Sequence, residues 1–268
     1  MIALVQRLAA RGVEAHVVSR GHGGSLEGPV RVDPRRHGAA EVGDEPLLLA
    51  AFAPVWIARD RAAAGRAAAA AGARAVVMDD GLQNPSLAKD LGIVVVDAGF
   101  GFGNGRVIPA GPLREPVGDG LARADLVLAI GDLAARARFL AEWPAVAALP
   151  VLGAELAPLP TGMDWPGLRA LAFAGIGRPE KVFATLRAAG AEIVAAHGFG
   201  DHARFDPRIL ARLAAEAQAR GAQLVTTEKD AARLPAAFRG KVLVLPVRLE
   251  LDDWAPLDAA LERLLPRA

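Results

Sequence analysis

The stretch "AVVMDDGLQN", residues 75–84, sets two adjacent aspartates at the end of a short apolar run. The run 75–78 predicts a buried strand, and Gly81 supplies the turn signal that ends it. Asp79 and Asp80 carry like charges, which are costly side by side unless water, a cation or a basic partner compensates them. The pair therefore predicts either a solvated turn or a magnesium site of Walker-B type, in which a carboxylate helps to hold the ion.

The chain on both sides of this stretch alternates between strand and helix patterns. Strand patterns lie at 13–19, 55–58, 92–98, 124–130, 168–175, 191–199, 222–227 and 241–249, and helical patterns lie at 1–12, 46–52, 60–72, 179–190 and 206–221. This alternation predicts an α/β fold with two open, mostly parallel sheets. A proline-rich stretch at 142–167 predicts a boundary, so we expect a first domain over 1–150 and a smaller one over 151–268. In such sheets, ligands bind beyond the carboxyl ends of the strands.

Composition excludes several classes of protein and site. The chain has 268 residues and a net charge of +1, so its overall charge does not indicate a nucleic-acid partner. It contains no cysteine, which excludes disulfides, thiolate metal sites and cysteine nucleophiles. The sequence also has no apolar run of about 18 residues, the length that spans a bilayer.

Two glycine-rich stretches follow predicted strands. "SRGHGG" (19–24) lets the backbone approach a ligand closely, although a flexible turn explains it equally well. "GFGFGNGRVIPAGPLREP" (99–116) does not meet the G-x-G-x-x-G spacing, and prolines stand where the dinucleotide-binding motif requires a helix. This argues against a dinucleotide-dependent oxidoreductase. The second stretch can still present Arg106 and Arg114 to an anion, although arginines in surface loops are usually just solvated.

Three polar positions have both a structural and a functional interpretation. Asp44, before Pro46 in "EVGDEPLLLA" (41–50), is a natural helix N-cap, yet near a phosphate it could accept a proton from an attacking hydroxyl. His202 lies in a polar loop, where a single histidine is more often structural than catalytic. Thr227 precedes Asp230 at near capping-box spacing, which favours a structural role.

Together and in this order, these motifs resemble one family, the tetraacyldisaccharide 4'-kinases. The resemblance rests on "VVSRGHGG", "VGDEPLLLA", "VVMDDGLQNPSLAKDL", "VVVDAGFGFGNGRVIPAGPLREP", "AFAGIGRPEKVFATLRAAGA", "DHARF" and "LVTTEKDAARL", and it runs from about residue 1 to residue 248. It implies two α/β/α domains, the first of them like a P-loop kinase core, with the active site in the cleft between them. It also implies an enzyme that uses ATP and magnesium to phosphorylate the disaccharide precursor of lipid A, in lipopolysaccharide biosynthesis. The enzyme would act peripherally at the cytoplasmic face of the bacterial inner membrane.

The resemblance also implies roles for particular residues. Asp44 would be the catalytic base and would act as a dyad with His202, while Asp79 and Asp80 would bind the magnesium ion. The residues implied in nucleotide and phosphate binding are Ser19, Arg20, Glu45, Arg114 and Glu115.

One departure from the family concerns its phosphate-binding loop. The family carries a Walker-A loop before its first helix, but here Met1 falls inside the helix that should follow, and G-x-x-x-x-G-K-[ST] occurs nowhere in the chain. We therefore expect a chain truncated before that helix, with little kinase activity on its own. The alternative is a non-catalytic remnant that binds a nucleotide or another anion. His22 is a smaller departure, since the family often has tyrosine there.

Overall fold

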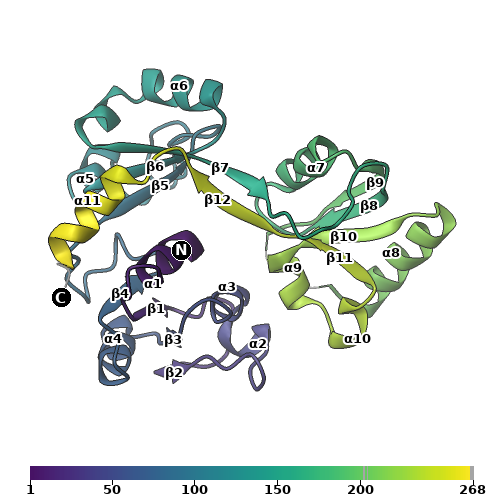
Figure 1. Cartoon of the computed structure of the whole chain (residues 1–268), viewed down its shortest axis with the longest axis horizontal. Helices are drawn as coiled ribbons and strands as arrows, with labels where there is room; N and C mark the ends of the chain where they lie inside the picture. The colour runs from purple at the N-terminus through teal and green to yellow at the C-terminus, as the bar shows by residue number, and fades with distance from the viewer. Residues whose placement is uncertain (202, 204, 266–268) are drawn as a thin grey trace. The chain divides into compact units, whose positions relative to one another are not determined.

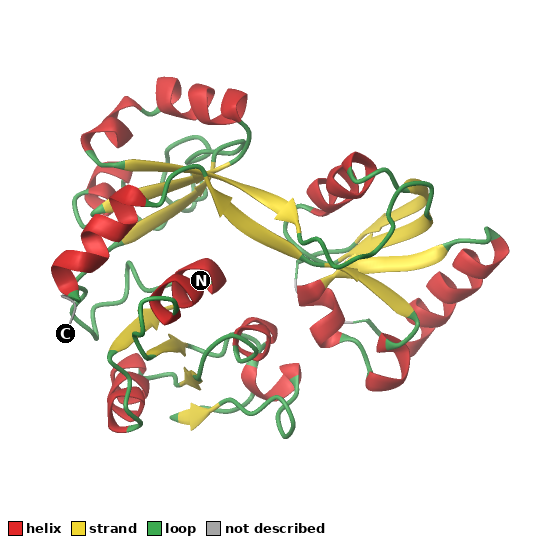
Figure 2. Ribbon diagram, viewed as in Figure 1, coloured by secondary structure: helices red, strands yellow, loops and turns green. Residues whose placement is uncertain are grey.

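The computed structural model describes residues 1–201, 203 and 205–265. The described residues form three four-stranded sheets with helices packed on them (Figures 1 and 2). They pack into two compact units, one of Met1–Asp79 with Pro158–Arg248 and the other of Asp80–Ala157 with Leu249–Ala268. This confirms an α/β fold with mostly parallel sheets. The sheets number three where two were predicted, and the domain boundary expected at residue 150 stays a prediction.

The first sheet belongs to the first unit and has the order β2-β3-β1-β4. Its strands are β1 (Ala15–Ser19), β2 (Val30–Arg31), β3 (Val55–Ile57) and β4 (Ala75–Met78), and its helices are α1 (Ile2–Ala9), α2 (Ala39–Val42), α3 (Asp44–Leu49) and α4 (Arg61–Ala70). Strand β1 is parallel to β3 and β4 and is buried along its whole length. The small residues Ala64 and Ala68 let α4 pack closely on β1 at Val18.

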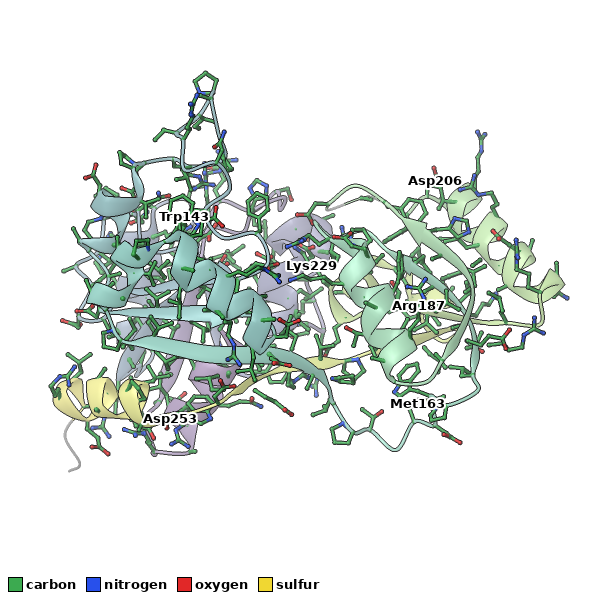
Figure 3. The ribbon with its side chains drawn as sticks, turned by 90° about the horizontal axis from the view of Figure 1, so that it is seen from above. Trp143, Met163, Arg187, Asp206, Lys229 and Asp253 are labelled. Carbon is green, nitrogen blue, oxygen red and sulfur yellow. The ribbon has the colours of Figure 1, made fainter. Side chains whose placement is uncertain are left out.

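The second unit contains most of the sheet β12-β7-β6-β5, of which Pro158 in β7 and the first two residues of β12 are assigned to the first unit. Its strands are β5 (Ile93–Asp97), β6 (Leu126–Ile130), β7 (Val151–Pro158) and β12 (Val247–Leu251), and its helices are α5 (Val117–Leu121), α6 (Leu133–Glu142), the 3-10 helix Pro144–Ala148 and α11 (Ala255–Leu264). Strands β5, β6 and β7 are parallel, while Figure 2 shows β12 running opposite to β7. Trp143, labelled in Figure 3, meets Phe102 edge to face with 5.2 Å between ring centres.

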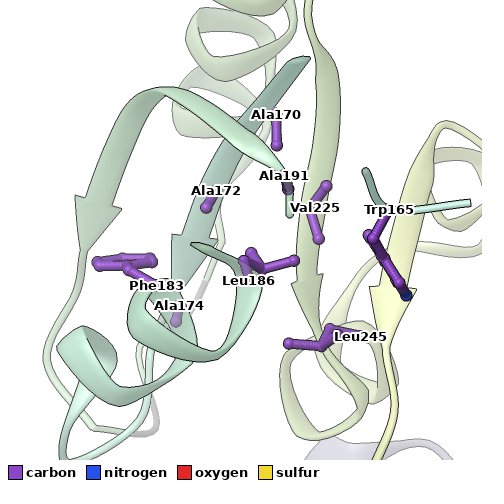
Figure 4. Close-up of a cluster of buried hydrophobic side chains, with 9 residues drawn as sticks. All are labelled: Trp165, Ala170, Ala172, Ala174, Phe183, Leu186, Ala191, Val225 and Leu245. Atoms are coloured by element: carbon purple, nitrogen blue, oxygen red, sulfur yellow. The ribbon is translucent and has the colours of Figure 1, made fainter. Parts of the chain in front are cut away.

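The third sheet returns to the first unit and has the order β11-β10-β8-β9. Its strands are β8 (Arg169–Ala174), β9 (Glu192–Gly198), β10 (Gln223–Thr227) and β11 (Val242–Leu245), and its helices are α7 (Pro179–Ala188), α8 (Pro207–Ala219), α9 (Glu228–Arg233) and α10 (Ala236–Arg239). Figure 4 shows Phe183 and Leu186 of α7 in one cluster with alternate residues of β8. The intervening residues Leu171 and Phe173 join α8 in a second cluster. Because β8 is buried on both faces, this part is an α/β/α sandwich.

One expectation about the end of the chain was wrong. Residues 241–249 were predicted as one strand, but β11 and β12 belong to different sheets and are separated by Pro246, whose nitrogen has no hydrogen to donate to a sheet. The stretch 142–167, where a boundary was predicted, also contains the 3-10 helix and the eight-residue strand β7. None of the described helices has the length and apolar character needed to cross a bilayer.

Candidate functional site

Ser19 and Asp79 lie side by side at the carboxyl ends of β1 and β4. The two strands are parallel with Val18 opposite Met78, so the residues that follow reach the same edge of the sheet. Ser19 is 4% exposed, and its Oγ donates a hydrogen bond to Asp79 Oδ2 at 3.0 Å. Arg61, also buried, donates from Nη1 to the Asp79 carbonyl oxygen at 2.7 Å. One oxygen of the Asp79 carboxylate thus accepts a hydrogen bond from a neutral hydroxyl.

Asp80 continues the chain in an unusual backbone conformation. Its φ of +51° lies in the left-handed region, which aspartate tolerates better than most residues, and its side chain is exposed. Among the described residues no three acidic or histidine side chains form a complete metal site. Mg²⁺ does not need one, because it is usually held by one or two carboxylates together with waters and phosphate oxygens. The hard oxygen donors of Asp79 and Asp80 therefore fit this ion.

Asp44 opens α3 from a tightly packed turn. Gly43 has φ +90°, and a Cβ there would lie 2.7 Å from the carbonyl oxygen of His22, so a larger residue would push this turn away from the 19–24 loop. Asp44 is only 5% exposed, although it is ionisable. Helix α3 packs against α9, and Arg233 of α9 brings its Nε within 3.6 Å of Asp44 Oδ2.

Lys229, labelled in Figure 3, connects two of the predicted motifs. Its Nζ donates to Glu45 Oε1 at 2.9 Å and lies 3.8 Å from Asp201 Oδ1. The G-D-E-P segment and the loop containing Asp201 therefore meet at one ammonium group within the first unit. His202 itself lies outside the described residues, so its pairing with Asp44 stays a prediction.

Glu115 has two partners in the second unit. Arg123 Nη2 lies 2.5 Å from each of its carboxylate oxygens, and Gln83 Nε2 donates to Oε1 at 2.9 Å. The hydrogen bond from Arg123, followed by that from Gln83, holds the pKa of Glu115 below its ordinary value. Arg114, the neighbouring residue, is exposed. Gln83 belongs to the motif that contains the two aspartates, and Glu115 belongs to the motif that ends in P-L-R-E-P. The hydrogen bond between them therefore joins two of the quoted motifs.

Replacing Arg123 with alanine is expected to raise the pKa of Glu115 toward its ordinary value, since Gln83 alone remains as a donor. A carboxyl group whose pKa is lower in the folded state stabilises the fold at pH values above its unfolded-state pKa. This contribution disappears as the pH falls through the folded-state pKa. The effect on stability is small because both side chains are solvated. Carbon-13 NMR titration of the Glu115 carboxyl measures the shift, with the exposed Arg138→Ala as control. An unchanged titration midpoint would contradict the assignment.

Arg20 lies at a separate surface hollow. The hollow measures about 240 Å³ and is lined by Arg20, His22, Arg59 and the glycines of the 19–24 loop. Arg59 is also paired with Glu27 at 2.9 Å. The functional roles predicted for Arg20, Ser19, Glu45, Arg114 and Glu115 stay predictions.

Sequence reasoning missed Lys229 and Arg233. The segment 225–234 was interpreted as structural because of Thr227 and Asp230. The position of this segment could have indicated a functional role. Three charged residues follow β10 directly, at the edge of the sheet where α/β proteins bind ligands.

Comparison with known proteins identifies the family. The sequence model of the family described as "Tetraacyldisaccharide-1-P 4'-kinase" matches residues 1–266. The chain belongs to this family. It is therefore an enzyme of the kinase class.

Tetraacyldisaccharide 4'-kinases from two bacteria share more than half of its sequence. The protein from Dinoroseobacter shibae is 66% identical over 100% of this chain and 80% of its own length. That from a Jannaschia species is 58% identical over 99% of this chain and 81% of its own length. The crystal structure of "apo" form LpxK from Aquifex aeolicus, in complex with ATP, has a TM-score of 0.71 at 21% identity and covers 98% of this chain and 83% of that chain. This likeness shows the shared fold.

Proposed function

We propose that this kinase transfers the γ-phosphoryl group of ATP to the 4'-hydroxyl of the tetraacyl disaccharide 1-phosphate precursor of lipid A. The observation that carries the proposal is the family match over residues 1–266. The named relatives are kinases for a tetraacyl disaccharide, and the structural relative from Aquifex aeolicus is in complex with ATP. A non-catalytic nucleotide-binding role is not favoured, because the relatives are named as kinases.

The proposed chemistry assigns each carboxylate a task. Asp79 and Asp80 would hold Mg²⁺, which when bound neutralises charge on the phosphates. Asp44 would orient the sugar hydroxyl and accept its proton, with His202 as its partner in the dyad. Such a weak base suffices because phosphoryl transfer depends more on positioning than on strong basicity.

The remaining predicted residues would surround the phosphates. Arg114 suits this role because a guanidinium can bind two phosphate oxygens at once, while Ser19, Arg20, Glu45 and Glu115 would complete the polar surroundings. The acceptor is a lipid, so we also propose that the enzyme works peripherally at the cytoplasmic face of the inner membrane.

A direct assay tests the proposed reaction. A form of the protein that carries the family's phosphate-binding loop before its first helix, which is also the parent of every variant below, is incubated with γ-labelled ATP, magnesium and the tetraacyl disaccharide 1-phosphate in detergent micelles. The product is analysed by mass spectrometry and phosphorus NMR. We expect one new phosphate, at the 4'-position. An acceptor with a blocked 4'-hydroxyl is the control and should remain unlabelled. Label at any other position, or equal labelling of the blocked acceptor, would refute the proposal.

A further inference from the structure

Helix α9 contains a buried ionic cluster that the proposed reaction does not yet use. Asp230 is 0% exposed, and its Oδ1 accepts a hydrogen bond from the Gly175 backbone nitrogen at 3.0 Å. Thr227 Oγ1 donates to Asp230 Oδ2 at 2.6 Å. Arg233 pairs with the Oδ1 atom of the same carboxylate. A buried carboxylate with this many donors is a rigid anchor for the arginine.

The guanidinium of Arg233 is held on several sides. Its Nη2 donates to the Gly175 carbonyl oxygen at 2.7 Å, and its Nη1 donates to the Ala203 carbonyl oxygen at 3.2 Å. Its central carbon lies 5.8 Å from the centre of the Phe205 ring. Because the group is planar, these contacts also determine the direction of the Nε–H bond.

Both terminal nitrogens of this guanidinium donate hydrogen bonds, but within the described part of the chain the inner nitrogen, Nε, does not. It is buried and has no hydrogen-bond partner among the described residues. Asp44 approaches it, with 3.6 Å between Nε and Oδ2, and the two side chains are only 9% and 6% exposed. That distance is too long for a hydrogen bond, yet close for an ion pair shielded from water.

We propose that Arg233 is the positioning residue for Asp44, and that it fixes the orientation of the carboxylate that accepts the proton of the sugar hydroxyl. This inference rests on the proposed function. Asp230 and the carbonyl oxygens of Gly175 and Ala203 hold the guanidinium in place. The guanidinium in turn holds the Asp44 carboxylate, so the position of α9 determines the orientation of the reacting group. Lys229 of the same helix already pairs with Glu45, the residue next to Asp44. Helix α9 therefore steadies both acidic residues of the G-D-E-P segment.

The proposal predicts that lysine cannot replace this arginine. A single ammonium group at position 233 keeps the charge, but it cannot bind Asp230, Gly175 and Asp44 in one plane. Misplacement of a catalytic group by about 1 Å can cost about 100-fold in rate. We expect Arg233→Lys to lower kcat by about 10- to 100-fold, with KM for ATP and for the acceptor nearly unchanged. Arg239→Lys is the matched control, because among the described residues Arg239 donates to backbone oxygens at the end of α9 and just beyond it, those of Ala232 and Leu234.

Two further measurements keep the proposal testable without relying on turnover. Hydrogen exchange of the backbone amides over 44–50 should be at least about tenfold faster in Arg233→Lys than in the parent and in Arg239→Lys, because α3 loses its support. Arg233→Ala should recover part of its kcat when guanidinium is added, provided that the fold survives, and Arg239→Ala should show no such recovery.

The outcomes separate the two proposals. Faster exchange with a selective loss of kcat supports the positioning role. Faster exchange in a protein whose parent transfers no phosphate supports the link from Arg233 to Asp44 and refutes the proposed function. Unchanged exchange over 44–50, or equal effects of Arg233→Lys and Arg239→Lys, overturns the inference whatever the activity.

Discussion

In the form of the protein that carries the phosphate-binding loop, replacing Asp44 with alanine is expected to lower kcat by about 1,000-fold, the scale that a general base contributes. The KM for ATP should change little, because the carboxylate acts on the acceptor hydroxyl and not on the nucleotide. Its burial at 5% exposure beside Arg233 supports a carboxylate held in one place. Steady-state kinetics with each substrate varied in turn measures both constants.

The partner proposed for Asp44 gives this experiment a second arm. His202→Ala should also lower kcat strongly, and the double variant should be little worse than the worse single variant, since residues that act as a unit are not additive. Asp60→Ala is the control. Asp60 caps α4 by accepting a hydrogen bond from the Ala62 backbone nitrogen, so its loss should cost about 1 kcal/mol of stability and leave kcat unchanged. Fully additive losses from Asp44 and His202 would exclude the dyad.

The strand and helix pattern could be predicted well because its signals are local. Strand β8 has apolar residues on both faces, and the glycines and prolines beside the helices mark their ends. The assignment of strands to sheets was less accessible. Residues 241–249 form one apolar run in sequence, and only the missing hydrogen of Pro246 hints that the run serves two sheets.

In the candidate site, too, the sequence did not reveal which distant residues contact one another. The structural interpretation of Thr227 and Asp230 is correct, because the Asp230 backbone nitrogen donates to Thr227 Oγ1 at 3.0 Å as a helix cap requires. It is incomplete, since the same carboxylate also pairs with Arg233, which reaches Asp44 from a distant part of the chain. Sequence spacing carries no information about that contact. Short motifs can therefore indicate which residues carry charge, but not which of them support one another.

The second prediction of a large effect concerns Asp79, the first residue of the acidic pair. Asp79→Asn keeps the size of the side chain and removes its charge, and we expect the magnesium concentration for half-maximal rate to rise and kcat to fall by about 100-fold. The reason is the loss of a negative oxygen donor, direct or through water, to the ion that neutralises the phosphates. Changes in the shell around a metal typically cost about 10- to 100-fold, so loss of a carboxylate should reach the upper end. Magnesium titrations of the initial rate at saturating ATP measure both effects.

Two control variants separate the charge of Asp79 from its structural contacts. Ser19→Ala removes the hydroxyl that donates to Asp79 Oδ2 but leaves the carboxylate. The magnesium concentration for half-maximal rate should therefore rise much less than in Asp79→Asn, whatever kcat is lost from the role proposed for Ser19 near the phosphates. Asp125→Asn makes the same change at a carboxylate that accepts a hydrogen bond from the Gly92 backbone nitrogen at 2.7 Å and has no proposed role at the magnesium ion. It should leave magnesium dependence unchanged. If the titration of Asp79→Asn overlays that of the parent, Asp79 is only part of a turn. If Ser19→Ala matches Asp79→Asn instead, the shape of this strand end matters more than its charge, and the magnesium assignment fails.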